Sequence, residues 1–206
     1  MTTAVAPRAP ARENTPGFAN PVAAFELASR PEHVFGILGR PGSAERGEVA
    51  MRMGIATRID FFFLLAYPMI YVGIARLLAA RGQLARGMSG VLVALAVVMG
   101  LADALENVQL LRLIDEVDPG RMLPMLARLR VFTLFKWYAL YAASGLVAAY
   151  VWRERDWWRW SAPLFALAAL LGLVATVHLP AIEWSIVPLG IAWTMTYVRA
   201  FRRQSA

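Results

Sequence analysis

The chain has 206 residues, of which 59% are hydrophobic and 17% charged, whereas soluble domains are roughly 45–50% apolar and about 25% charged. Its formal net charge is +7, but the arginines flank apolar runs instead of forming a basic patch interleaved with aromatic residues, which argues against nucleic acid as a partner. Cysteine is absent, which excludes disulfides, thiolate nucleophiles and cysteine-ligated zinc or iron–sulfur centres.

Residues 1–50 are predicted to form a polar N-terminal tail. They are rich in proline and charged residues and contain no apolar run followed by a small-residue cleavage site, so we expect neither a signal peptide nor a membrane span there. We expect residues 1–18 to be disordered. Residues 21–38 are apolar enough to form short helices that lie on the surface of the protein or of the membrane.

Residues 51–206 contain five apolar segments, each close to the length that an α-helix needs to cross a hydrocarbon core of ~30 Å. The segments cover about 59–80, 88–111, 131–152, 161–179 and 184–201. The sequence therefore predicts an all-α fold, a polytopic transmembrane helix bundle of about five spans. A polar, proline-containing turn at 178–183 separates the last two segments, and a re-entrant pair is the alternative to two full spans. Arginines near the spans do not decide the orientation.

Six ionisable residues lie within or next to these apolar segments, where each charge costs about 2.5–3.5 kcal/mol even on insertion scales. They are Asp60, Asp103, Glu106, Lys136, His178 and Glu183. Glu106 and Lys136 are each about five residues from the connection between the second and third segments, so an antiparallel hairpin brings them to the same depth. The directions of the segments predict that all six groups lie in one half of the bilayer.

The spacing of polar residues within the segments agrees with a shared site. Asp103, Glu106 and Asn107 are spaced i, i+3 and i+4, which places them on one helical face. By the same rule Asp60 shares a face with Tyr67 and Tyr71. Lys136 is the only lysine among 21 basic residues, and a desolvated ammonium can lose its proton whereas a guanidinium effectively cannot. We expect a polar pocket enclosed by the bundle and open towards the N-terminal side.

We assign candidate roles to the residues of this pocket. The candidate catalytic group has Asp103 as proton donor or base, Glu106 as its partner, Lys136 as the tuning charge, and Asp60. The candidate substrate-binding residues are Tyr67, Tyr71, Asn107, Trp137, His178 and Glu183. We predict neither a metal nor a cofactor, because the chain lacks the Glu-x-x-His pairs of di-iron bundles and His178 is the only histidine in the apolar region.

Three of these motifs together resemble a pattern in a family of small bacterial multi-pass membrane proteins. The motifs are Asp60-Phe-Phe-Phe with Tyr67, Asp103-Ala-Leu-Glu106-Asn107, and Lys136-Trp137. The resemblance covers the first three apolar segments. It implies the inner (plasma) membrane of a bacterium and implies no activity.

The sequence favours acid–base chemistry on, or binding of, a lipophilic substrate such as a lipid or isoprenoid. Two alternatives stay open. The first is a non-enzymatic membrane assembly or binding protein whose charged cluster is structural, which leaves open whether the chain is an enzyme. The second is a small proton-coupled transporter, which five spans could build only as a homo-oligomer.

Overall fold

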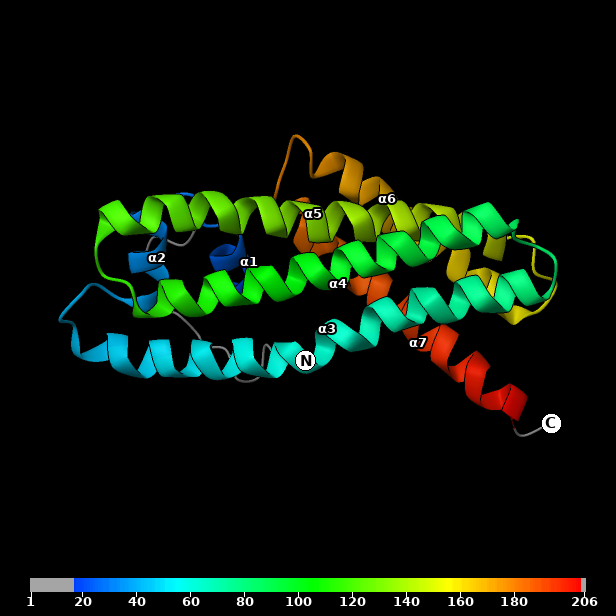
Figure 1. Ribbon diagram of the computed structural model, residues 1–206, viewed down its shortest axis with the longest axis horizontal. Helices are drawn as coiled ribbons and strands as arrows, with labels where there is room; N and C mark the ends of the chain where they lie inside the picture. Colours follow the sequence, from blue (N-terminus) through cyan, green and yellow to red (C-terminus); the bar gives the residue numbers. More distant parts are fainter. Residues whose placement is uncertain (1–16, 205–206) are drawn as a thin grey trace. The chain divides into compact units, whose positions relative to one another are not determined.

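The computed structural model describes the backbone of residues 17–204 and the side chains of residues 17–201. Within this range the chain forms seven α-helices, one short 3-10 helix and no strand (Figure 1). The prediction of an all-α fold is confirmed. Residues 1–16, which hold most of the segment predicted to be disordered, lie outside the described residues.

The chain divides into two units, which we describe separately. The first unit comprises residues 17–65 and Gly100–Lys136, and the second comprises Ala66–Met99 and the chain from Trp137 onwards. Three long helices contribute a part to each unit; they are α3 (Ala44–Ala80), α4 (Arg86–Asp115) and α5 (Pro119–Val151).

Four helical segments among the described residues are long and apolar enough to cross a membrane, as the prediction of a polytopic transmembrane bundle requires. They are α3, α4, α5 and Trp157–Val174, the last of which joins the 3-10 helix η2 (Trp157–Ser161) to α6 (Ala162–Val174). The fifth predicted segment lies in α7 (Ala181–Gln204), which is not among the four. Its polar and aromatic residues, with Glu183 and Arg199, lower its mean hydropathy.

Two short helices, α1 (Pro21–Glu26) and α2 (Pro31–Leu38), complete the first unit. Each begins with proline, whose fixed φ and missing N–H suit the first turn of a helix. Their apolar side chains are buried, among them Phe25, Val34 and Leu38. Residues 21–38 therefore form the predicted short helices and contribute to the core of this unit, and α3 begins at Ala44, before the predicted end of the tail.

A buried arginine joins three segments of the first unit. Arg46 donates hydrogen bonds to the carbonyl oxygens of Gly39 at 2.8 Å, Ile114 at 3.3 Å and Glu116 at 2.9 Å. Its guanidinium also lies over the ring of Phe35, 5.8 Å from the ring centroid. The last carbonyls of a helix have no partner within the helix, so Arg46 caps the end of α4 and fixes it to the turn before α3.

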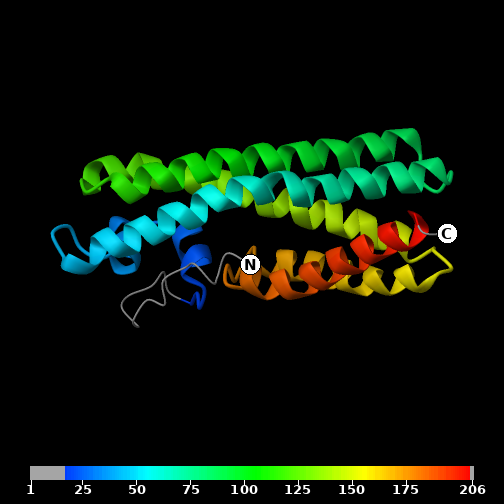
Figure 2. The same cartoon turned by 90° about the horizontal axis from the view of Figure 1, so that it is seen from below.

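In the second unit, α6 and α7 pack side by side (Figure 2), and α6 packs closely on α5. Gly172 lies so near Tyr141 that an added Cβ would be 2.3 Å from its ring. The Tyr141 hydroxyl hydrogen-bonds the Ser185 hydroxyl of α7 at 2.9 Å. A residue without a side chain is thus needed at position 172, where α5 and α6 approach each other.

A charge-balanced network closes one end of the second unit. Arg199 Nη2 contacts Glu154 Oε2 and Asp156 Oδ2, each at 2.8 Å, and Arg81 Nη1 contacts the same Glu154 oxygen at 2.6 Å. The Arg199 guanidinium also lies 3.9 Å from the centroid of the Trp158 ring. Among the described side chains, two acids face two arginines in this network, which is the arrangement expected where charges serve to hold segments together.

Candidate functional site

Three carboxyl groups of the first unit converge on the amine of Lys136. Lys136 Nζ lies 2.6 Å from Glu106 Oε1, 3.2 Å from Glu26 Oε2 and 3.3 Å from Asp103 Oδ1. The exposed fraction of these side chains is 9% for Lys136, 0% for Glu106, 3% for Asp103 and 14% for Glu26. The structure thus brings Asp103, Glu106 and Lys136 into direct contact and adds a fourth member. We call these four residues the Lys136 cluster.

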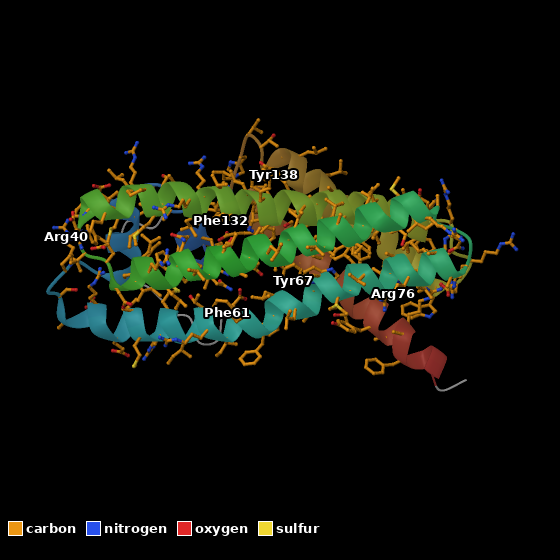
Figure 3. All side chains as sticks on the ribbon, in the orientation of Figure 1. Arg40, Phe61, Tyr67, Arg76, Phe132 and Tyr138 are labelled. Atoms are coloured by element: carbon orange, nitrogen blue, oxygen red, sulfur yellow. The ribbon has the colours of Figure 1, made fainter. Side chains whose placement is uncertain are left out.

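Three helices of the first unit position the cluster. Asp103 and Glu106 are one turn apart on α4, so both carboxyls face the same side, and Lys136 lies on the part of α5 that packs against it. Figure 3 labels Phe132 on α5 and Phe61 on α3, close in sequence to Lys136 and Asp60. The hairpin of α4 and α5 is therefore sufficient to assemble the central acid–amine contact.

The short helix α1 supplies the fourth member. Glu26 is its last residue, and the Glu26 backbone carbonyl accepts a hydrogen bond from Thr133 Oγ1 at 3.1 Å. Thr133 lies about one turn before Lys136 on α5, so two neighbouring positions of α5 hold both the backbone and the carboxylate of Glu26. The cluster consequently fastens α1 to the transmembrane part of this unit.

A second polar pair lies beside the cluster on α3 and α4. Asn107 Nδ2 donates to Asp60 Oδ2 at 3.0 Å. Asn107 is buried and follows Glu106 directly in the sequence, while Asp60 is half-buried. The predicted residues Asp60 and Asn107 therefore belong to the same unit as the cluster and link α3 to α4.

Among the described residues, the Lys136 cluster contains more acidic groups than basic groups. Because the Glu26 and Asp103 oxygens lie 3.2 and 3.3 Å from Nζ, the carboxyl oxygens that contact it lie no more than about 6.5 Å from one another, and like charges this close disfavour ionisation. Burial raises the pKa of Glu26, and the Lys136 ammonium opposes this rise. One ammonium compensates one carboxylate. The described groups of the cluster therefore carry a net negative charge unless carboxyl groups hold protons.

One carboxyl oxygen of Glu106 is buried without a hydrogen bond from any described residue. Glu106 Oε1 contacts the ammonium, whereas Glu106 Oε2 has no such partner and is inaccessible to solvent. A buried carboxyl oxygen left in this way is costly unless it carries a proton or meets a polar group. Glu106 Oε2 is therefore the candidate position for a proton on this carboxyl group.

The remaining candidate substrate-binding residues belong to the second unit. Tyr71 is fully buried and hydrogen-bonds Ser144 at 2.7 Å, and Tyr67 stacks on Trp193 at 5.9 Å. Trp137 stacks on Tyr141 at 5.9 Å. At the turn before α7, His178 is exposed and lies against Trp184, while Glu183 is half-buried in the first turn of α7. Their contacts within this unit are those of packing and helix-end residues.

Sequence reasoning missed Glu26. The stretch Phe25-Glu26-Leu27 gives only one signal, a single acid between apolar residues in a short helix bounded by prolines. That pattern also fits a helix on the surface. Which side of α1 contacts α5 depends on tertiary packing, and no spacing within residues 21–38 reports it.

A search of the chain against models of protein families, against curated proteins and against solved structures found no match. Among residues 17–204, no group of three or more histidine, aspartate or glutamate side chains is placed to hold a metal ion. The chemistry of the Lys136 cluster is the feature of the described residues that points to a function.

Proposed function

We propose that this membrane protein binds a lipophilic molecule, a lipid or an isoprenoid, at the Lys136 cluster and exchanges a proton with it. One observation carries the proposal: three carboxyl groups surround one ammonium in the interior of a transmembrane helix bundle. We expect the cluster to hold a proton on a carboxyl group at neutral pH, because three carboxylates close to one ammonium repel one another, and this repulsion costs free energy in a network that only stabilises a fold. The balanced network of Arg199 and Arg81 with Glu154 and Asp156 illustrates the structural case in the same chain.

Each member of the cluster has a defined part in such an exchange. Asp103 gives its proton to the substrate or takes one from it, and Glu106 receives or returns the proton beside it. The Lys136 ammonium stabilises whichever carboxylate remains and keeps its own proton throughout. The step moves one proton and needs no oxidant or reductant. The proposal includes the bacterial inner membrane, the setting implied by the resemblance of the Asp60, Asp103–Asn107 and Lys136 motifs.

Mass spectrometry of molecules retained by the purified protein tests the proposal without a guess about the substrate. Wild-type protein should retain a defined lipophilic species above the background of bulk lipid. Asp103→Asn should lower its occupancy by at least about tenfold, equivalent to ~1.4 kcal/mol. The matched control is Glu154→Gln, which removes a buried acid from the balanced network and should leave the retained species unchanged.

Two results would contradict the proposal. The first is a folded Asp103→Asn protein with the same retained species as the wild type. The second is an equal loss in Asp103→Asn and Glu154→Gln, because the loss would then reflect general destabilisation.

The contacts of Glu26 favour a second candidate function, in which the cluster is a structural fastening for α1. Lys136 and Thr133 of α5 bind the carboxylate and the carbonyl of Glu26. If this is the function, the double substitution Glu106→Gln and Lys136→Met should lose less stability than Lys136→Met alone, because it leaves two neutral side chains instead of a buried carboxylate without its ammonium. Loss of stability in Asp103→Asn without any change in retained molecules would favour this candidate over the first.

A further inference from the structure

An arginine of the second unit is held between two exposed tryptophans. The Arg159 guanidinium lies 4.8 Å from the centroid of the Trp152 ring and 5.3 Å from that of Trp160. The two rings are edge to face, with centroids 6.1 Å apart. Trp152 and Trp160 are 48% and 60% exposed. Aromatic faces attract a guanidinium and restrict its motion without neutralising its charge.

Arg159 differs in this respect from Arg199 of the same unit. Arg199 contacts two carboxylates and is buried. The Arg159 side chain forms no ion pair or hydrogen bond with any residue in the described part of the chain, and its Nε is buried without a hydrogen-bond partner. Because Arg159 is half-buried, its positive charge and several N–H groups remain available to an anion that approaches beside the two rings.

The position of Arg159 in the chain indicates which class of anion would bind there. Arg159 lies in η2, at the beginning of the membrane-spanning segment Trp157–Val174. Tryptophans at the end of a span favour the level of the lipid headgroups. Arg153, close by in the sequence, likewise lies over an aromatic ring, that of Tyr150, at 5.2 Å. A guanidinium forms paired, charge-assisted hydrogen bonds with a phosphate group, and indole rings pack well against the glycerol and upper acyl region of a lipid.

We propose that Arg159, held between Trp152 and Trp160, binds the phosphate of an anionic membrane lipid. The site lies in the second unit and is independent of the proton exchange proposed for the Lys136 cluster. Its recognition chemistry is a bidentate guanidinium–phosphate contact flanked by indole rings. Lipids whose headgroup carries its own cation should bind more weakly, because that cation is repelled by Arg159 and Arg153.

Native mass spectrometry in detergent, with titrated phosphatidylglycerol, tests this site. The full-length protein should bind a first phosphatidylglycerol at least about fivefold more tightly than phosphatidylcholine, a difference of ~1 kcal/mol. Arg159→Gln and Trp160→Ala should each remove that preference. Arg159→Lys should retain part of it, because lysine keeps the charge but loses the planar fork. The matched control is Arg112→Gln, which removes an exposed arginine of the first unit and should leave the preference intact.

Three results would overturn the proposal. One is an unchanged lipid preference in Arg159→Gln. Another is an equal loss in Arg112→Gln, which would show a general effect of net charge. The third is displacement of phosphatidylglycerol by millimolar glycerol phosphate, which would show a site for a soluble phosphate. Because the Arg159 side chain is half-buried and forms no hydrogen bond or ion pair with a described residue, Arg159→Gln should fold, and its thermal unfolding curve verifies this.

Discussion

Replacement of Lys136 by methionine removes the only positive charge that the described residues place within the cluster. Lys136 Nζ contacts three carboxyl groups, and the shortest contact is 2.6 Å to a fully buried Glu106. Removal of one partner of a buried ion pair typically costs about 3–5 kcal/mol. For a chain of this size, each kcal/mol lowers the unfolding midpoint by about 2–4 °C, so Lys136→Met should lose roughly 6–20 °C.

The deficit should depend on pH with a defined sign. Without the ammonium, the carboxyl groups are relieved of their charge only by protonation, which becomes easier as the pH falls. The difference in unfolding midpoint between wild type and Lys136→Met should therefore be largest at neutral pH and smaller in acid. Tryptophan fluorescence of both proteins in lipid nanodiscs, heated at a series of pH values, measures it.

A matched control separates burial from simple loss of charge. Arg121 forms a 3.6 Å contact with Asp118 in which both side chains are more than half exposed, and an exposed pair contributes only about 0–1 kcal/mol. Arg121→Met should therefore change the midpoint by no more than a few degrees. The reasoning is refuted if Lys136→Met loses no more stability than Arg121→Met, or if its deficit grows as the pH falls.

Three further predictions concern the packing and the charges around the site. Burial raises the pKa of Glu26 above its ordinary 4.5, so the folded chain holds a proton that the unfolded chain releases, and the free energy of unfolding falls as the pH rises above about 4.5. In Glu26→Gln the unfolding midpoint should therefore fall less steeply with pH than in the wild type. Equal pH dependence of the two midpoints would contradict this prediction. Gly172→Ala places a methyl group against Tyr141 and should lower the free energy of unfolding by about 1–3 kcal/mol. The methyl group of Gly190→Ala meets open space, so that substitution should be neutral or slightly stabilising. Equal effects of the two substitutions in denaturant unfolding would exclude the clash. Arg46→Gln deprives three carbonyl oxygens of a donor and should lower the free energy of unfolding by about 1–3 kcal/mol. Arg52→Gln breaks an exposed pair with Glu48 and should lower it by less than about 1 kcal/mol. Equal losses in the same unfolding assay would show that the hydrogen bonds of Arg46 do not stabilise the fold.

The central contact of the cluster could be predicted because it depends on local geometry. Asp103 and Glu106 share a helical face by their spacing, and the distance of Glu106 and Lys136 from one hairpin fixes their depth. Long apolar runs likewise predicted the helices that cross the membrane. These inferences need only the rise and the periodicity of an α-helix.

Contacts that depend on tertiary packing could not be predicted in this way. Glu26 reaches Lys136 only because α1 docks on α5, and residues 21–38 by themselves do not reveal that docking. Arg46 and Arg199 are typical in sequence of the arginines that flank apolar runs, yet both are buried and form hydrogen bonds within the fold. A single arginine at a helix end looks the same in sequence whether it faces lipid headgroups or caps carbonyl groups.

The boundaries of the fourth predicted span, 161–179, could not be predicted from composition either. Residues 161–201 were divided at the polar turn, and the chain does form two helices there, α6 and α7. However, α6 alone has 13 residues, a length of about 20 Å against a hydrocarbon core of ~30 Å. It reaches the length of a span only with the preceding η2, which is a tryptophan-rich 3-10 helix.

Direct detection of the retained proton is the sharpest test of the claim that the Lys136 cluster carries surplus acid. Infrared spectroscopy of the protein in lipid at neutral pH should show the carbonyl band of a protonated carboxyl group. The band should weaken or vanish in Glu106→Gln and Asp103→Asn and persist in Glu154→Gln, whose acid belongs to the charge-balanced network. A wild-type spectrum without that band, or a band that survives both substitutions in the cluster, would show that these acids are fully ionised and would remove the basis for proton exchange.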